Sequence, residues 1–253
     1  MVKIHFVCSS KPKSGNAYQV MVRRYGQYPA YEADCIVVLS GDGMILRTFH
    51  ESYQHNLPVY GMNCGDLGFL TNKYNENNLI ERIQSAVSLK FHPLRAWIED
   101  ENGEKFSTIA VNEVYLLRET HQSAKLQVKV DGVIRLKELV CDGLITSSAI
   151  GSTAYNYSAG GPIIPSGASL LALTPISSFR PRCWRGALLP ETTCVELEVR
   201  DSTRRPVCAV ADYVEFRKAV NVKIVQDKSL TFSLLLDSDS TLKKKILEEQ
   251  FAT

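Results

Sequence analysis

The residues best suited to chemistry in the first half of the chain are Ser40-Gly41-Asp42-Gly43, a carboxylate between two glycines. They follow the apolar run Cys35–Leu39, which is typical of a strand buried on both faces. From Ile45 to Tyr53, apolar residues then recur at helical spacing. Glycine permits positive φ and a close approach of ligand to backbone, and the free N–H groups of a helix start attract phosphate. We therefore expect an anion site at Asp42, with simple N-capping of the helix as the alternative.

A second candidate region is a long uncharged stretch. From Gly143 to Phe179 no residue is charged or a histidine, and glycines and prolines interrupt it too often for a membrane span. It is either a buried hydrophobic loop or a loop whose backbone and hydroxyl groups find partners on a ligand rich in hydroxyls and ring nitrogens. Asp142 stands at its entrance. A helix should begin at Gly151-Ser152-Thr153, with Ser or Thr as its cap, and end at Gly160-Gly161.

The third candidate is Asn112-Glu113, two polar residues inside an apolar strand pattern. Neighbouring residues of a regular strand face opposite sides, so both can meet one ligand only at a bulge or a strand end. The alternative is that they mark a sheet edge or a hairpin corner.

The elements that would position these residues alternate between strand and helix in the first part of the chain. Strands are expected near 2–8, 35–39 and 57–62, and helices near 14–25, 44–54 and 76–89. Such alternation indicates right-handed parallel units with helices packed on a sheet. Ligands bind such sheets beyond the carboxyl ends of the strands, which is where Asp42 would lie.

After Pro93 the pattern becomes largely β. The strand-like segments are Trp97–Glu99, Ser107–Leu117, Lys125–Val130, Val133–Leu139, Val195–Arg200, Val207–Val210, Val214–Phe216, Asn221–Val225 and Leu230–Leu236, with hairpin turns at Asn102-Gly103 and Asp131-Gly132 and a terminal helix over Thr241–Phe251. We predict an α/β domain with a parallel sheet over 1–92, which carries the Gly-Asp-Gly turn. A largely antiparallel all-β domain should follow over 93–228, and a strand and helix over 229–253 should return toward the first domain.

Composition disfavours several classes of protein. Hydrophobic residues make up 45% and charged residues 22%, as in ordinary globular chains. A net charge of +2, from 29 basic and 27 acidic residues, gives no case for binding nucleic acid or a membrane surface. The seven cysteines are scattered without Cys-x-x-Cys spacing, which favours a reduced protein with buried thiols over a disulfide scaffold or a zinc site. The N-terminus is interpreted as a first strand rather than a signal peptide, so a cytoplasmic protein is expected.

In order and approximate spacing, these motifs resemble those of the NAD kinase family, of the bacterial type that uses ATP or polyphosphate. The match is carried by Ser40-Gly41-Asp42-Gly43, Gly65-Asp66-Leu67-Gly68-Phe69-Leu70, Val111-Asn112-Glu113-Val114, Asp142-Gly143-Leu144 and Gly151-Ser152-Thr153-Ala154-Tyr155-Asn156. The last is the most specific, and the resemblance runs from the first strand to beyond Asp212. One departure is Ser40, where the family usually has glycine, because serine tolerates positive φ less well.

The resemblance implies a role for each candidate residue. Asp42 would lie at the phosphoryl-transfer centre, as a base or a Mg²⁺ ligand, and the field of the helix N-terminus should keep it ionised. Asn112 and Glu113 would hold the adenosine and its ribose, while Asp142 and Ala154 would meet the nicotinamide part. The remaining candidates would line the dinucleotide site, reach a phosphate or bond a ribose hydroxyl: Gly43, Arg47, Thr153, Tyr155, Asn156, Ser158 and Asp212. For Arg47 the alternative to a phosphate contact is that it is simply a solvated residue on the helix surface.

The implied reaction phosphorylates the 2′-hydroxyl of the adenosine ribose of NAD, giving NADP, with Mg²⁺ and ATP or another phosphoryl donor such as polyphosphate. The resemblance also implies a homodimer or homotetramer and a 93–228 domain that binds NAD. A lipid kinase of the diacylglycerol or sphingosine type is the enzymatic alternative, against which Asn112-Glu113 and the Gly-Ser-Thr-Ala-Tyr stretch argue. A non-catalytic dinucleotide-binding module is the other alternative, against which Asp42 argues.

Overall fold

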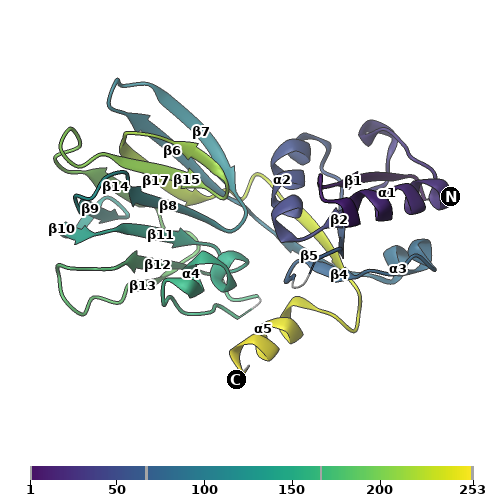
Figure 1. The fold of residues 1–253 in the computed structure, drawn as a ribbon. Coiled ribbons are helices and arrows are strands. Elements are labelled where there is room, and N and C mark those ends of the chain that lie inside the picture. Colours follow the sequence, from purple (N-terminus) through teal and green to yellow (C-terminus); the bar gives the residue numbers. More distant parts are fainter. Residues whose placement is uncertain (1, 66–67, 166, 252–253) are drawn as a thin grey trace. The chain divides into compact units, whose positions relative to one another are not determined.

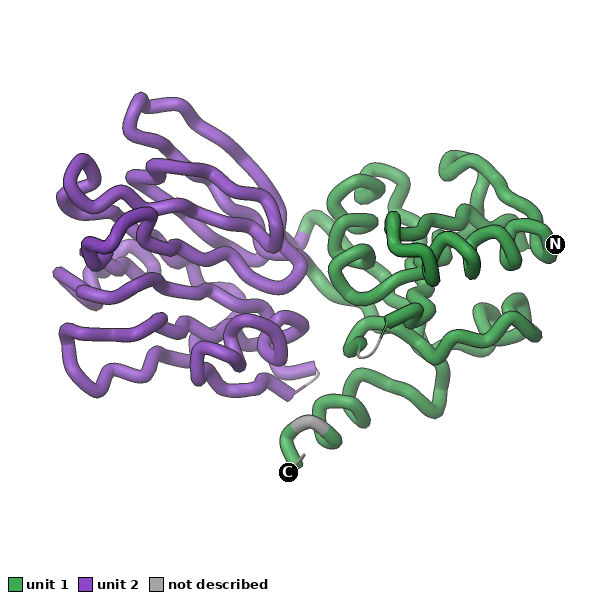
Figure 2. Tube along the Cα trace, viewed as in Figure 1, with its two compact units in different colours: residues 1–92, 229–253 green, residues 93–228 purple. Residues whose placement is uncertain are grey.

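The computed structural model describes residues 2–65, 68–165 and 167–251, which fall into two compact units. The first unit comprises residues 1–92 and 229–253, and the second comprises residues 93–228 (Figure 2). The chain therefore leaves the first unit once and comes back to it. No helix of the described residues is long and apolar enough to cross a bilayer.

The first unit is built on one sheet of six strands. Its strands are β1 (Ile4–Cys8), β2 (Cys35–Ser40), β3 (Val59–Asn63), β4 (Thr71–Lys73), β5 (Val87–Phe91) and β18 (Phe232–Leu236), and its helices are α1 (Pro12–Tyr25), α2 (Asp42–Ser52), α3 (Leu79–Ser85) and α5 (Leu242–Gln250). The order is β1-β2-β3-β18-β5, with β4 beside β3. In Figure 1, β18 is the yellow strand whose chain continues to α5. All neighbouring strands run parallel except β5, which is antiparallel to β18.

The apolar run of β2 is buried at every position, as its composition predicts. Val37 and Leu39 join Met21 of α1 in one apolar cluster, while α2 buries Ile45 and Phe49. Because β18 inserts between β3 and β5, the prediction of a parallel α/β domain to which the C-terminal segment returns is confirmed.

The predicted helix over 76–89 is wrong in its second half. α3 ends at Ser85, and Val87–Phe91 forms β5. Apolar and polar residues alternate along β5, which suits a strand, and its pairing partner β18 comes from the far end of the chain. A local pattern could not reveal that partner.

The second unit consists of antiparallel strands. They are β6 (Leu94–Asp100), β7 (Lys105–Ala110), β8 (Glu113–Arg118), β9 (Ala124–Val130), β10 (Val133–Cys141), β11 (Gly143–Ser147), β12 (Leu170–Ile176), β13 (Ala187–Pro190), β14 (Val195–Val199), β15 (Val207–Ala211), β16 (Val214–Phe216) and β17 (Ala219–Gln226). Two six-stranded sheets result, in the orders β10-β9-β14-β17-β6-β7 and β13-β12-β11-β8-β15-β16. Inward-facing residues of both sheets form one apolar core, which confirms the predicted all-β domain.

Two expectations for this unit need correction. The segment 107–117 is not one strand, because β7 ends at Ala110 in one sheet and β8 begins at Glu113 in the other. The uncharged stretch is not a loop throughout, because β11 and β12 lie within it and pair with each other. Its backbone groups therefore find many of their partners in the sheet. The hairpins predicted at Asn102-Gly103 and Asp131-Gly132 are confirmed as the β6–β7 and β9–β10 turns.

Candidate active site

Asp42 is the first residue of α2 and lies directly beyond the carboxyl end of β2. Gly41 is the N-cap, with φ −102° and an extended backbone, and Gly43 lies inside the helix. The expected positive-φ turn is therefore wrong. Ser40 is the buried last residue of β2, so its place in the motif requires no glycine conformation.

The effect of the two glycines is to leave the backbone without side chains at this point. Neither glycine adopts a positive φ. Apart from its chain neighbours and the backbone of its own helix, a Cβ built on Gly41 or Gly43 would meet no heavy atom of the described chain within 4 Å. Packing within this chain therefore does not demand glycine at either position. The first N–H groups of a helix have no acceptor within the helix, and their partial positive charge favours a phosphate.

The Asp42 carboxylate is held by a loop rather than by its own helix. Phe69 N–H donates to Oδ2 at 2.8 Å and Leu70 N–H donates to Oδ1 at 3.0 Å. The N-capping alternative is therefore wrong. Burial raises the pKa of Asp42, while these two hydrogen bonds and the charge of Lys245 act in the opposite direction. Burial, not the helix field, sets the direction of the shift, and a raised pKa makes the carboxylate a better proton acceptor.

Two other predicted features near Asp42 are the Gly65–Leu70 motif and Arg47. Residues 66 and 67 of the Gly65–Leu70 motif lie outside the described residues. Arg47 is exposed on α2, and its Nε donates to Glu51 Oε1 at 2.7 Å, one turn along the helix. That contact suits the solvated alternative, and a phosphate contact by Arg47 stays a prediction.

In the second unit, three strand ends meet at one edge of the β8 sheet. β8 begins at Glu113, β11 ends opposite it at Ser147, and β15 ends at Ala211. Asn112 thus occupies the break before β8, which is the strand end that a shared ligand requires. The predicted pair is brought to an edge where loop residues can surround it.

Asp212 fixes this edge. Its Oδ2 accepts the N–H of Val111 at 2.7 Å, and its Oδ1 accepts those of Asn112 at 2.9 Å and Glu113 at 3.3 Å. The structure thus gives Asp212 the task of anchoring the Asn-Glu turn, and a ribose contact by it stays a prediction. Gly151 packs directly against this turn. A Cβ built on it would lie 2.3–2.4 Å from backbone atoms of Asn112, so only glycine fits there.

Glu113 is a buried carboxyl with spare hydrogen-bonding capacity. It is 6% exposed, and its Oε2 has no hydrogen-bond partner in the described chain. Burial, and then the negative charge of Asp212, raise the pKa of Glu113 to about 8. Buried polar atoms are normally satisfied, so this oxygen is suited to a hydroxyl or amino group of a ligand.

The raised pKa of Glu113 predicts a pH-dependent stability. The folded protein keeps a proton that the unfolded chain loses near the ordinary value of 4.5, so the free energy of unfolding should fall as pH rises from about 4.5 to 8. Glu113→Gln should remove most of that loss, which is about 4 kcal/mol, or roughly 8–16 °C in Tm, between pH 5 and pH 9. Thermal melts at both pH values test this. Glu215→Gln, on the exposed side of β16, should melt like the parent, and equal slopes for all three proteins would contradict the assignment.

The segment after β11 forms only a short helical turn. A 3₁₀ turn at Gly151–Thr153 leads into α4 (Tyr155–Ser158), and neither has the expected side-chain cap. Gly160, with φ +83°, follows the end of α4 as predicted. Figure 1 shows α4 beside β11 and β12, and the Tyr155 ring meets Tyr115 of β8 edge-on, 5.0 Å between centroids.

Asn156 holds this segment to the sheet. Its Nδ2 donates to Ser152 O at 3.0 Å and Pro162 O at 2.9 Å, and its Oδ1 accepts from Thr174 Oγ1 at 2.7 Å. It is fully buried, so the structure gives it a scaffolding role and a ligand contact stays a prediction. The other predicted residues of the segment are accessible: Thr153, Ala154 and Tyr155 are half-buried and Ser158 is exposed.

Asp142 lies at the opposite end of the same strand pair. It precedes Gly143, which pairs with Leu117, whereas Ser147 pairs with Glu113. Four residue steps separate these pairs, a distance of about 13 Å along the strands. The residues expected to meet adenosine and those expected to meet nicotinamide are thus spaced for an extended ligand.

Arg118, which the sequence analysis did not single out, is paired with the candidate residue Asp142. Its Nε donates to Asp142 Oδ1 at 2.6 Å, and both side chains are about one-third exposed. The pairing follows from the β8–β11 register, so no local signal announces it.

Comparison with known proteins gives a consistent set of similarities. Residues 8–88 match the family model of the ATP-NAD kinase N-terminal domain, and residues 111–232 match that of the C-terminal domain. The NAD kinase of Rhizobium meliloti (strain 1021) is 48% identical over 98% of this chain and 96% of its own length. That of Caulobacter vibrioides is 45% identical over 100% of this chain and 97% of its own.

Two solved structures share the fold at low sequence identity. Yeast NADH kinase complexed with NADH superposes with a TM-score of 0.84 at 18% identity, covering 100% of this chain and 89% of the other. An NAD kinase from Archaeoglobus fulgidus in complex with ATP gives 0.77 at 21% identity, covering 97% and 99%.

Proposed function

Because this chain belongs to the ATP-NAD kinase family, we propose that it phosphorylates the 2′-hydroxyl of the adenosine ribose of NAD to give NADP. One observation carries the proposal. Asp42, a carboxylate of raised pKa oriented by two backbone amides, opens a helix whose glycine backbone is free to receive phosphate. Full-length identity to NAD kinases supports the choice of acceptor.

The proposed transfer needs a base and positioned phosphates. A ribose hydroxyl is a poor nucleophile, so Asp42 accepts its proton as the 2′-oxygen forms a bond to the γ-phosphorus of ATP. The bond from that phosphorus to the β–γ bridging oxygen breaks, and ADP leaves. The backbone N–H groups of Gly41 and Gly43, beside which no side chain intrudes, bind phosphate oxygens, with Arg47 as a further phosphate contact.

Mg²⁺ fits the residues present. No cluster of three or more His, Cys, Asp or Glu side chains capable of binding a metal occurs among the described residues. Mg²⁺ commonly binds substrate phosphates and water with only one or two protein carboxylates, so the phosphates of a bound nucleotide would supply its ligands while the Asp42 carboxylate remains the base. When bound there, the ion would neutralise phosphate charge.

The second unit supplies the dinucleotide contacts in this proposal. Asn112 and Glu113 bind the adenosine and its ribose, and the unpartnered Oε2 of Glu113 supports that role. Asp142 and Ala154 meet the nicotinamide part from the other end of the β8–β11 pair. The remaining contacts come from Thr153, Tyr155 and Ser158. On the family resemblance we also infer a cytoplasmic homodimer or homotetramer.

The test is incubation of the purified chain with NAD, Mg²⁺ and ATP, coupled to a dehydrogenase specific for NADP. NADP should accumulate only when all three are present. Diacylglycerol or sphingosine phosphorylated in place of NAD would establish a lipid kinase, and NAD binding without turnover would establish a binding module. Replacing ATP with polyphosphate in the same assay identifies the donor.

A further inference from the structure

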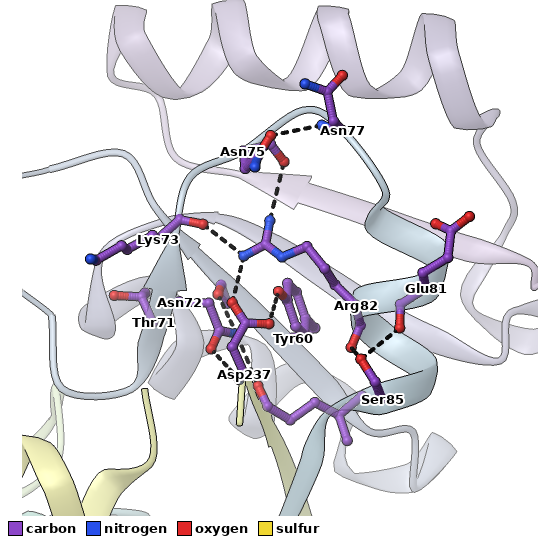
Figure 3. A network of polar contacts seen from close by, with 12 residues as sticks. Tyr60, Thr71, Asn72, Lys73, Asn75, Asn77, Glu81, Arg82, Ser85 and Asp237 are labelled. Carbon is purple, nitrogen blue, oxygen red and sulfur yellow. Dashed lines mark hydrogen bonds and ion pairs between the residues drawn. The ribbon is translucent and has the colours of Figure 1, made fainter. Parts of the chain in front are cut away.

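The segment that follows β18 is fixed to the first unit by a polar network. Tyr60 Oη donates to Asp237 Oδ1 at 2.6 Å, and an Arg82 nitrogen donates to Oδ2 at 2.6 Å (Figure 3). The N–H of Asp237 donates to Asn72 Oδ1 at 2.8 Å. The Arg82 and Asp237 side chains are less than one-fifth exposed. The chain that enters α5 therefore starts from a defined point.

α5 places a lysine against the loop that holds Asp42. Leu242 and Ile246, one turn apart on α5, are buried, and Lys245 lies between them in sequence. The Lys245 Nζ donates to three backbone carbonyls of one loop, those of Gly68 (3.3 Å), Phe69 (3.0 Å) and Thr71. An ammonium has three N–H donors, so this loop occupies all of them.

The loop has two polar sides with different partners. Its carbonyls accept from Lys245, and its amides at Phe69 and Leu70 donate to Asp42. The backbone of the loop at Gly68 lies close to the Asp42 carboxylate. A Cβ built on Gly68 would lie 2.1 Å from Thr71 Oγ1 and 3.0 Å from Asp42 Oδ1. The loop therefore cannot shift on the lysine side without moving the amides on the carboxylate side.

We propose that Lys245 is a positioning residue for phosphoryl transfer, which holds loop 68–71 in the arrangement that orients the Asp42 carboxylate. The proposal rests on the proposed function and assigns the C-terminal helix to its site. Without the ammonium, three carbonyl oxygens would face one another with no donor between them, so the loop would relax. The charge of Lys245 also lowers the pKa of Asp42. The acidic groups that act on Lys245 are Asp42, Asp237 and Glu248.

The main variant is Lys245→Met, which keeps the aliphatic stem and removes the donors and the charge. We expect kcat to fall at least tenfold with the KM for NAD within about twofold. The acid limb of the kcat–pH profile should move to higher pH, because Asp42 loses the charge that lowers its pKa. Lys245→Arg, which keeps the charge, should hold that limb at the parent position. Lys243→Met, an exposed neighbour on α5, is the matched control and should match the parent throughout.

Amide hydrogen exchange provides a readout that needs no turnover. In Lys245→Met the amides of Phe69 and Leu70 should exchange faster, while those of β2 stay protected as in the parent and in Lys243→Met. A folded Lys245→Met protein with parent kcat, pH profile and loop protection would overturn the proposal. Should Lys245→Met not fold, Gly68→Ala pushes the same loop from its other side, and parent kcat in that variant overturns it equally. Absence of NADP formation by the parent would instead refute the proposed function, and exchange at the loop would still test the role of Lys245.

Discussion

Asp42→Asn should lower kcat by roughly 10²–10⁴-fold while NAD binds with close to the parent affinity. The variant has nearly the same size but cannot accept the proton of a ribose hydroxyl at the pH of the assay. The loss corresponds to a barrier about 3–5 kcal/mol higher, and it should appear in kcat rather than in the KM for NAD, because the proton moves only in the transition state. Steady-state kinetics with NAD varied at saturating ATP measure both constants.

The same variant should also lose some stability, for a reason the hydrogen bonds make clear. The carboxylate accepts from both Phe69 and Leu70, whereas an amide side chain offers one oxygen and turns an NH₂ group toward the other N–H. One donor left unpaired costs about 1–3 kcal/mol. Asp34→Asn is the matched control, because Asp34 also accepts a backbone N–H in the first unit, from Lys3 at 2.8 Å. It should keep the parent kcat. A folded Asp42→Asn protein with kcat within about threefold of the parent would make Asp42 a loop anchor and remove the proposed base.

The parts of the site that the sequence predicted are those set by local pattern. The succession of strand, glycine turn and helix around Asp42 involves residues adjacent in the chain, and buried apolar runs and helical spacing report directly on it. The strand break at Asn112 could also be predicted from the sequence, because two consecutive polar residues in an apolar strand can contact one ligand only at a bulge or where the strand ends. Both predictions placed the residue correctly, although the reason given for the glycines of the first motif was wrong.

The parts that could not be predicted depend on partners distant in sequence. Asp42 receives its hydrogen bonds from residues 27 and 28 positions further on. Arg118 reaches Asp142 only through the β8–β11 register. Lys245 lies near the end of the chain, in a basic run that looks like a solvated helix face until its three carbonyl acceptors are seen. No periodicity or propensity carries such information, because these contacts form only when segments distant in sequence pack together in the fold.

Asp212→Asn should weaken NAD binding by about 10–100-fold and leave kcat at saturating NAD within about threefold of the parent. Asp212 has φ +54°, a conformation that asparagine tolerates well, so the turn between β15 and β16 should persist. The carboxylate accepts three N–H groups on its two oxygens, whereas an amide offers one oxygen and leaves at least one of those donors facing an NH₂ group. An unpaired donor costs about 1–3 kcal/mol, which at about 1.4 kcal/mol per tenfold gives the expected loss of affinity if it loosens the Asn112-Glu113 turn.

Asp131→Asn supplies a closely matched control for this variant. Asp131 also has a positive φ, of 51°, in a hairpin turn of the second unit, and its Oδ1 accepts the N–H of Cys194 at 2.8 Å. Its replacement should leave both Tm and the Kd for NAD, measured by calorimetry, close to the parent values, because the single N–H keeps an amide oxygen as its acceptor. Asp212→Asn should also lower the pKa of Glu113, because the charge of Asp212 raises it, so the midpoint of the pH dependence of NAD binding should lie at lower pH than in the parent. If Asp212→Asn and Asp131→Asn both bind NAD with the parent affinity and the parent pH dependence, the anchored turn has only a structural role in the second unit. The adenosine must then be held elsewhere.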